Sequence, residues 1–481
     1  MGISPVATGD QGAAFGNRKF FEKNLTKNFS AGFVRTWGYN KNNFYGRQTM
    51  ILHKHFNVNA EGHLTIGGMD SVELAKKHGT PLYIIDENVL RAQCRIYREA
   101  ARKYFGEDAL PLYASKALCF TGIYKIAAEE GMGIDCVSGG ELYTAKKAGF
   151  PAERIYFHGN NKTDKDISDA MDMGVGTFVV DNNDELSAVS REATRRGITQ
   201  RILLRITPGI DPHTHRAIVT GNVDSKFGSA IETGQAMEIV KKAIDTEGVC
   251  LAGLHCHIGS QIFDIEPFAD AAAIMTQFIA KIKKECDFEI KELNLGGGLG
   301  VRYTEYDREI DYADCIGKIA KVVTELCEKN GIAQPRIILE PGRSLVAAAG
   351  ATLYTVGSVK EITGFRNYVS VDGGMPDNPR YALYQSQYTA LIANKASEPK
   401  TYRATIAGRC CESGDLLGEN MELQKAERGD ILAVLVTGAY NYSMASNYNR
   451  IPRPPVVMIK DGKDRVAVKR ETYEDIVRND V

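Results

Sequence analysis

The stretch Gly133-Ile-Asp-Cys-Val-Ser-Gly-Gly-Glu-Leu-Tyr-Thr-Ala-Lys-Lys-Ala148 contains the unit from which most of this chain is built. A short apolar run, Gly133–Val137, ends in small and polar residues, and an amphipathic stretch, Glu141–Ala148, follows it. Ser138 and Glu141 have the spacing of a capping box, which typically opens a helix. The sequence therefore predicts a strand that leads directly into a helix.

The same unit recurs from about residue 109 to residue 341. Its apolar, β-branched runs are Ala109–Tyr113, Gly133–Val137, Arg154–Phe157, Thr177–Val180, Arg201–Ile206, Leu251–His257, Ile290–Leu295 and Arg336–Leu339. Strands that alternate with helices indicate parallel strands joined by crossovers. Eight such units predict a closed (β/α)8 barrel, and a doubly wound open sheet is the alternative.

The pattern changes after residue 345, where short β-rich runs are separated by Gly and Asn turns. Similar short runs occur before the barrel, at Leu64–Ile66 and Leu82–Ile85. We therefore expect a second, all-β domain formed by residues 50–84 and 345–481, with the barrel at 85–344 between its two parts. Residues 1–49 show no repeated apolar period and are expected to be a leader of little fixed structure, with Met50 as the native start.

The composition excludes several classes of protein. Lys and Arg total 59 against 60 Asp and Glu, so charge gives no reason to expect a nucleic-acid or membrane partner. No run approaches the roughly 18 apolar residues of a membrane span. The ten cysteines are scattered and form no CxxC pair, which argues against a zinc ribbon or a secreted disulfide scaffold. A cytoplasmic protein is expected.

Active sites of such barrels lie at the carboxyl ends of the strands, so the residues after each run are the candidates. These are Ser115-Lys116, Asp135, Ser138–Glu141, His158–Asn161, His255–Gln261, Gly296–Gly298 and Glu340–Arg343. Reactive side chains and glycine backbone thus converge on one rim.

Three of these candidates together suggest a phosphorylated aldehyde cofactor. Gly296–Gly298 is either a tight turn or a loop that brings three backbone N–H groups to a phosphate. In the second case the guanidinium of Arg343 would donate two further hydrogen bonds to the phosphate. Lys116 is either a surface lysine or an amine that forms a Schiff base. Glu340 is either an ion-pair partner of Arg343 or the carboxylate that keeps a pyridine nitrogen protonated.

His255 and His257 share one face of the predicted strand, because strand side chains alternate with a period of two. They could bind a metal, stack on a cofactor ring or belong to the core. A metal site would need more ligands at other strand ends, so no metal is expected.

Taken together, these residues resemble the alanine-racemase-like group of pyridoxal-phosphate enzymes, and within it the diaminopimelate decarboxylases, from about residue 50 to 470. The matching motifs are Tyr113-Ala-Ser-Lys116, His158-Gly-Asn-Asn-Lys162, His255-Cys-His-Ile-Gly-Ser-Gln261, Gly296–Gly298, Glu340, Asp372-Gly-Gly-Met375, Arg380-Tyr-Ala-Leu-Tyr384, Cys411-Glu-Ser-Gly-Asp415 and Gly438-Ala-Tyr440. Tyr381, where many relatives have Pro, and Arg409-Cys410 are departures from the family pattern.

The resemblance implies a role for each of these residues. The cofactor residues would be Lys116, His257, Ser260, Gly296, Gly297, Gly298, Glu340, Gly342, Arg343 and Tyr440. The substrate residues would be Arg343, Arg380, Tyr384 and Glu412, and Cys411 would be the catalytic proton donor. Because Cys411 and Glu412 reach into the partner's site in the family, a homodimer with shared active sites is expected.

The implied reaction converts meso-2,6-diaminopimelate to L-lysine and CO₂, the last step of lysine biosynthesis. A decarboxylase for ornithine, arginine or carboxynorspermidine is the nearest alternative, and Arg380 with Glu412 favours a substrate with a distal amino-acid group. A racemase, a metal-dependent barrel hydrolase and a catalytically inactive regulatory relative are the remaining alternatives.

Overall fold

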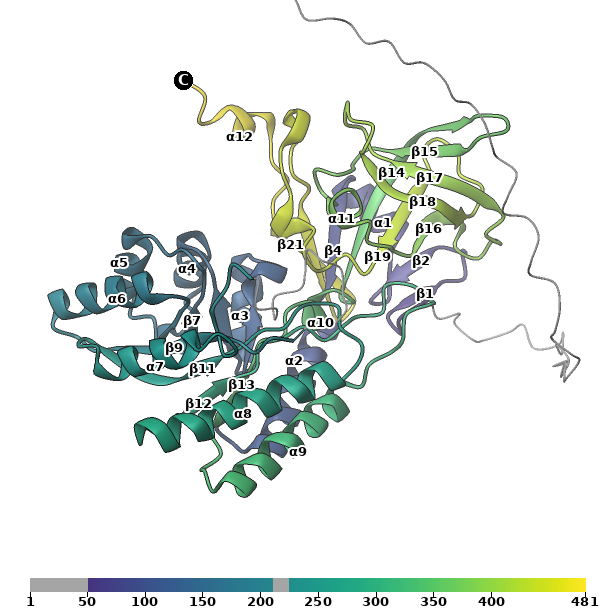
Figure 1. Ribbon diagram of the computed structural model, residues 1–481. Helices are drawn as coiled ribbons and strands as arrows, with labels where there is room; N and C mark the ends of the chain where they lie inside the picture. The colour runs from purple at the N-terminus through teal and green to yellow at the C-terminus, as the bar shows by residue number, and fades with distance from the viewer. Residues whose placement is uncertain (1–50, 211–224) are drawn as a thin grey trace, which may run out of the picture. The chain divides into compact units, whose positions relative to one another are not determined.

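The computed structural model describes residues 51–210 and 225–481, so the predicted leader and Met50 lie outside the described residues. In these ranges, parallel strands close into a barrel in the order β5-β6-β7-β8-β9-β11-β12-β13, and β13 pairs back to β5 (Figure 1). Their bounds are β5 (Leu110–Ala114), β6 (Gly133–Cys136), β7 (Ile155–Phe157), β8 (Thr177–Val180), β9 (Gln200–Thr207), β11 (Val249–His255), β12 (Glu292–Asn294) and β13 (Arg336–Leu339). The short strand β10 (Ser229–Ala230) pairs in parallel with the end of β9. The predicted eight-stranded barrel is confirmed, because an open sheet would not join β13 to β5.

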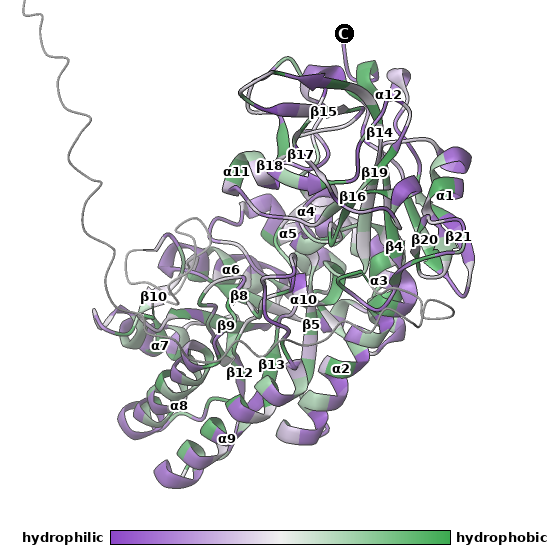
Figure 2. Ribbon diagram, turned by 90° about the vertical axis from the view of Figure 1, so that its right-hand side faces the viewer, coloured by the Kyte–Doolittle hydropathy of each residue, from purple (hydrophilic) through white to green (hydrophobic). Residues whose placement is uncertain are grey.

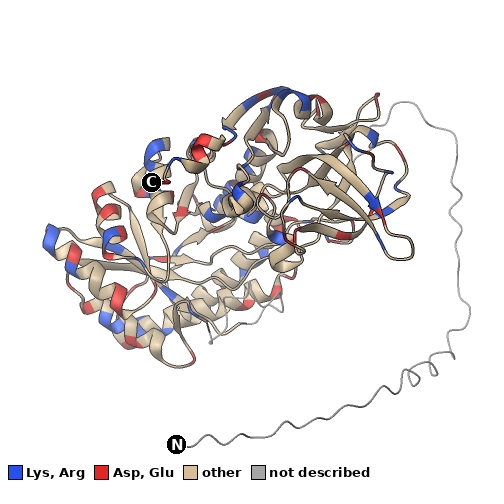
Figure 3. Cartoon of the chain, turned by 90° about the horizontal axis from the view of Figure 1, so that it is seen from above, with Lys and Arg blue, Asp and Glu red and all other residues tan. Residues whose placement is uncertain are grey.

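Helices alternate with the barrel strands. They are α2 (Glu87–Phe105), α3 (Thr121–Glu129), α4 (Gly139–Ala148), α5 (Asp164–Met173), α6 (Asn183–Arg196), α7 (Gln235–Asp245), α8 (Glu266–Cys286), α9 (Tyr312–Asn330) and the short α10 (Arg343–Val346). α8 and α9 carry both apolar and polar residues (Figure 2), as expected of helices with one buried face. Charges of both signs are interspersed on the helices (Figure 3).

The predicted capping box of α4 is half correct. Ser138 Oγ accepts the N–H of Glu141 at 3.3 Å, as a capping residue does. The Glu141 carboxylate, however, accepts the N–H of Val137 at 2.7 Å and not that of Ser138. The helix therefore starts where the sequence predicts, with a slightly different set of bonds.

The second domain is mostly sheet. Its main strands are β4 (Leu82–Asp86), β14 (Gly350–Glu361), β15 (Asn367–Val371), β16 (Ala390–Ile392), β17 (Tyr402–Ala407), β18 (Leu416–Leu423), β19 (Ile431–Leu435), β20 (Val456–Lys460) and β21 (Lys463–Val468). β4 pairs with β14 and β20, so the segments before and after the barrel share one sheet. On this pairing we propose the domain division at 84/85 and 344/345.

Smaller elements complete this domain, which is therefore not purely β. They are the strands β1 (Phe56–Val58), β2 (Leu64–Ile66) and β3 (Met69–Asp70), and the helices α1 (Ser71–His78), α11 (Arg380–Tyr384) and α12 (Tyr473–Val477). None of the helices in the described ranges is long and apolar enough to cross a membrane.

Candidate active site

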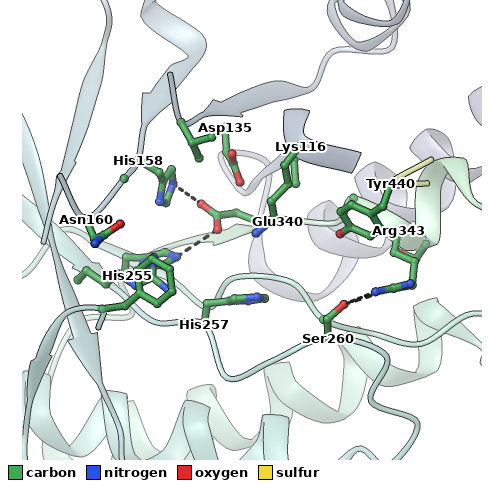
Figure 4. Close-up of a pocket in the computed structure, with 18 of the residues that line it drawn as sticks. Lys116, Asp135, His158, Asn160, His255, His257, Ser260, Glu340, Arg343 and Tyr440 are labelled. Atoms are coloured by element: carbon green, nitrogen blue, oxygen red, sulfur yellow. Dashed lines mark hydrogen bonds and ion pairs between the residues drawn. The ribbon is translucent and has the colours of Figure 1, made fainter. Parts of the chain in front are cut away.

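A cavity of about 500 Å³ lies at the carboxyl ends of the barrel strands. The barrel residues that line it include Lys116, Asp135, His158, Asn160, Arg205, His255, His257, Ser260, Gly298, Glu340, Gly342 and Arg343, and the sheet domain adds Arg380, Tyr384, Tyr440 and Met444 (Figure 4). Lys116, Glu340 and one residue of the predicted glycine loop Gly296–Gly298, namely Gly298, thus line the same cavity.

The alternation of strand residues explains why polar groups collect there. Leu112, Tyr156, Val179, Leu203, Ala252 and Ile338 form a separate buried cluster inside the barrel. Two residues after Tyr156, Leu203 and Ile338 come His158, Arg205 and Glu340; Arg205 is still in β9, and the other two follow the ends of β7 and β13. A buried, mostly apolar layer therefore lies beneath these charged and polar side chains.

Lys116 follows β5 on a short 3-10 turn, Ser115–Ala117. Its neighbours Ser115 and Ala117 are fully buried, whereas Lys116 itself is exposed and lines the cavity. The buried neighbours fix the turn, so the amine is presented to the cavity from a rigid support.

The glycine loop packs too tightly for any side chain. A Cβ on Gly296, Gly297 or Gly298 would lie 2.5, 2.1 or 2.4 Å from the carbonyl oxygen of Cys256, Glu340 or Gly259, respectively. Gly296 and Gly298 also have positive φ values, +69° and +123°. Gly298 lines the main cavity, while Gly296 and Gly297 line, with Gly298, a smaller space of about 30 Å³ beside it.

Arg343 and Ser260 line the same cavity as Gly298, and Figure 4 shows them in contact with each other. The guanidinium of Arg343 donates to Ser260 Oγ at 2.8 and 3.2 Å and to the Tyr303 hydroxyl at 2.8 Å. Its carbon lies 4.8 Å from the ring centre of Tyr440. The alternative role of Arg343, an ion pair with Glu340, is not found, because Glu340 contacts other partners.

Glu340 is buried at the centre of the rim. Its Oε1 lies 2.7 Å from His158 Nε2 and accepts a hydrogen bond from Asn294 Nδ2 at 2.7 Å, and its Oε2 lies 3.1 Å from His255 Nε2. Burial alone would raise the pKa of Glu340, but His158 and His255 outweigh it and hold the pKa well below its usual range. The carboxylate is therefore ionised.

The two histidines of the HxH motif have different surroundings. β11 ends at His255, so His257 lies beyond the strand, although both side chains line the cavity. His255 contacts Glu340, whereas Nδ1 of His257 accepts the N–H of Gly297 at 3.4 Å. Burial lowers the pKa of His255 to about 4, and burial with Lys116 and Arg205 nearby lowers that of His257 further. Both rings are neutral at pH 7.

The predicted substrate residues fall into two groups. Arg380 is buried, and two of its nitrogens, Nε and Nη1, have no hydrogen-bond acceptor among the described residues. Tyr384 lies near it, with 5.9 Å between guanidinium carbon and ring centre. Cys411 and Glu412 are exposed and do not line the cavity of their own chain.

Comparison with known proteins assigns the family. The family model described as pyridoxal-dependent decarboxylase, pyridoxal binding domain, matches residues 90–347. The diaminopimelate decarboxylase of Bacillus subtilis is 48% identical over 432 residues, 90% of this chain and 98% of that protein. The chain belongs to the diaminopimelate decarboxylase family. The Synechocystis diaminopimelate decarboxylase is 42% identical over 88% of this chain and 91% of its own length.

Solved structures of this decarboxylase family have the same fold. The diaminopimelate decarboxylase of M. jannaschii matches with a TM-score of 0.83 and 37% identity over 89% of this chain and 98% of that one. The Helicobacter pylori enzyme complexed with L-lysine matches with a TM-score of 0.77 and 32% identity, over 85% and 98% of the two chains. The alanine-racemase-like fold and an enzymatic role as a pyridoxal-phosphate decarboxylase are thereby confirmed.

Pyridoxal phosphate is the cofactor of this family, and the cavity fits it. One lysine amine, the end of a glycine loop at Gly298, and one carboxylate held ionised lie around a single space. Each matches one part of the cofactor: the aldehyde, the phosphate and the pyridine nitrogen.

Sequence reasoning missed Arg205 and Tyr303. Arg205 lies on β9 two residues after the inward-facing Leu203, with its guanidinium carbon 4.1 Å from the ring centre of Phe227. Strand alternation within the run Arg201–Ile206 is the signal that could have identified it. Tyr303 is buried between two cations: burial raises its pKa, but Arg343 and Arg380 outweigh burial and lower it. No local sequence signal marks Tyr303.

Proposed function

We propose that this decarboxylase converts meso-2,6-diaminopimelate to L-lysine and CO₂. The observation that carries the proposal is the buried Arg380, which lines the same cavity as Lys116 and Glu340 and has two nitrogens, Nε and Nη1, without an acceptor among the described residues. A buried cation without an acceptor is costly unless a ligand supplies the anion. The distal carboxylate of diaminopimelate is such an anion, whereas ornithine and arginine have no carboxylate at that end.

Each residue of the site then has a role. Lys116 would hold the aldehyde, and Gly296, Gly297, Gly298, Ser260, Arg343 and Tyr440 would bind the phosphate, with Gly342 beside them. His257 would stack on the ring, and Glu340 would contact the pyridine nitrogen. Bound pyridoxal phosphate supplies the sink for the electrons that departing CO₂ leaves behind.

The substrate's far end would be held by charge complementarity. Arg380, Arg343 and Tyr384 would bind the distal carboxylate, and Glu412 of the partner subunit would bind the distal amine. Cys411 of the partner subunit would donate a proton to the α-carbon. Exposure of Cys411 and Glu412 outside their own cavity supports a homodimer in which each site is completed by the other chain. The ten free cysteines support a reducing, cytoplasmic setting.

The test is a substrate panel assayed for released CO₂, with meso-diaminopimelate, ornithine, arginine and lysine side by side. We expect turnover with meso-diaminopimelate at a kcat/KM well above the others. Preferential turnover of ornithine or arginine would refute the proposal.

A variant adds a sharper test of substrate recognition. Arg380→Leu should raise the KM for meso-diaminopimelate by about ten- to a hundredfold, because a charge-assisted pair is lost. The matched control is Arg302→Leu, since Arg302 lines the neighbouring cavity and pairs with the exposed Glu309. An unchanged KM in Arg380→Leu would exclude Arg380 from substrate binding.

A further inference from the structure

The Glu340 carboxylate is surrounded by nitrogen atoms from three different strands' ends. His158 follows β7, His255 ends β11 and Asn294 ends β12, and all three are buried. The rings of His158 and His255 are packed edge to face, with centroids 4.8 Å apart. Figure 4 shows Glu340 lying between the two imidazoles.

The distribution of these contacts on the carboxylate is uneven. A carboxylate has about four acceptor positions, two on each oxygen. Oε1 faces two nitrogens, His158 Nε2 and Asn294 Nδ2, whereas Oε2 faces His255 Nε2. Among the described residues, one acceptor position on Oε2 is left for a donor that is not part of the chain.

The orientations of two of these side chains, Asn294 and His255, are determined by their other contacts. Asn294 Oδ1 accepts the N–H of Gly296 at 2.9 Å, so its amide nitrogen must face Glu340. His255 Nδ1 is buried with no partner among the described residues, so the proton of this neutral ring belongs on Nε2, facing the carboxylate. Neutral donors of this kind stabilise the carboxylate and leave its negative charge uncancelled.

We propose that His158, His255 and Asn294 are positioning residues that fix the Glu340 carboxylate and leave one acceptor on Oε2 for the pyridine N–H of the cofactor. This inference rests on the proposed role of Glu340 and assigns its three supporting side chains. It also gives the HxH motif two separate functions, with His255 acting through Glu340 and His257 facing the cavity directly.

A bound metal is the competing explanation for the same cluster. The ligand atoms of His158, His255 and Glu340 lie within 4.8 Å of one another, close enough to share an ion. A metal would bind the two imidazoles through deprotonated Nε2 atoms. It would also bind the Glu340 carboxylate, which in our proposal contacts the cofactor instead. The two explanations therefore predict opposite effects of removing the imidazoles.

The experiment measures the Kd of pyridoxal phosphate for the apoenzyme and the absorption maximum of the bound cofactor. His158→Leu and His255→Leu each remove an imidazole that contacts the Glu340 carboxylate, and we expect the Kd to rise about ten- to a hundredfold, with a shifted absorption maximum. His158→Gln and His255→Gln keep an N–H near Nε2 and should restore most of the affinity. If a leucine variant does not fold, Asn294→Ala is measured in its place, and its Kd for pyridoxal phosphate should also rise.

The matched control is His78→Leu. His78 also contacts a carboxylate, that of Asp464, at 2.6 Å, but neither residue lines the cavity. It should leave the Kd and the spectrum unchanged.

Three outcomes would overturn the proposal: leucine variants with the wild-type Kd and spectrum, glutamine variants as weak as the leucine variants, or a stoichiometric metal in the wild-type protein that the leucine variants lose. None of these measurements uses substrate. Failure of the wild type to release CO₂ from meso-diaminopimelate would refute the proposed function and leave this inference standing.

Discussion

Replacing Gly297 by alanine tests the glycine loop at its tightest point. The added Cβ would lie 2.1 Å from the carbonyl oxygen of Glu340, whereas ordinary contact begins at about 3.4 Å. The loop and the end of β13 therefore have to separate by about 1 Å. They are tied together by the Glu340 N–H, which donates to Gly296 O at 2.7 Å. Relief of the clash thus moves either the phosphate loop or the carboxylate that contacts the pyridine nitrogen.

The cost follows from this geometry. Overpacking a well-packed site costs about 1–3 kcal/mol in the free energy of unfolding. A displacement of about 1 Å between two groups that bind one ligand lowers function by up to about a hundredfold. We expect Gly297→Ala to raise the Kd of pyridoxal phosphate at least about tenfold, a loss of about 1.4 kcal/mol or more in binding free energy.

The assay is titration of the apoenzyme with pyridoxal phosphate, followed by absorbance, with thermal unfolding measured in parallel. Gly357→Ala is the matched control, because Gly357 lies in β14 and its Cβ would have 3.8 Å of space to the nearest atom. A Gly297→Ala protein that is destabilised but binds the cofactor with the wild-type Kd would refute the phosphate-loop reasoning, since the loop would then be a structural turn alone.

Two further predictions follow from other parts of the chain. The variants Lys116→Ala and Cys411→Ala should each lose most turnover. When the two are unfolded, mixed and refolded together, half of the dimers should contain one subunit of each kind and therefore one intact site, so about a quarter of wild-type activity should return. No recovery in the mixture would argue against sites shared between subunits. Burial lowers the pKa of His55 to about 4 from 6.5 in the unfolded chain, so the unfolded state binds more protons as the pH falls below about 6.5. This group alone should lower the free energy of unfolding by roughly 2 kcal/mol between pH 7 and pH 5. Chemical denaturation should show a smaller decrease over this pH range in His55→Phe than in the wild type. The same decrease in both proteins would mean that His55 titrates normally.

Much of the architecture is predictable because its signals are local. The repeat of apolar run and amphipathic stretch predicts the closed barrel, and the capping residue Ser138 places the start of α4. Lys116, Glu340 and the glycine loop all follow barrel strands, and strand ends of a barrel meet at one rim whatever the sequence between them. The sequence alone therefore predicts that these residues lie together.

Tertiary structure alone decided which groups touch. Glu340 is 85 residues from His255 and 46 from Asn294 in sequence, and barrel closure brings them within hydrogen-bond distance. Spacing indicated a pair of histidines on one strand face, but the strand ends at His255 and the two rings contact different groups. Tyr303 comes between Arg343 and Arg380 through the packing of the sheet domain on the barrel rim. Periodicity is a property of the local chain, whereas the distance between two side chains from different strands depends on register and closure of the whole barrel.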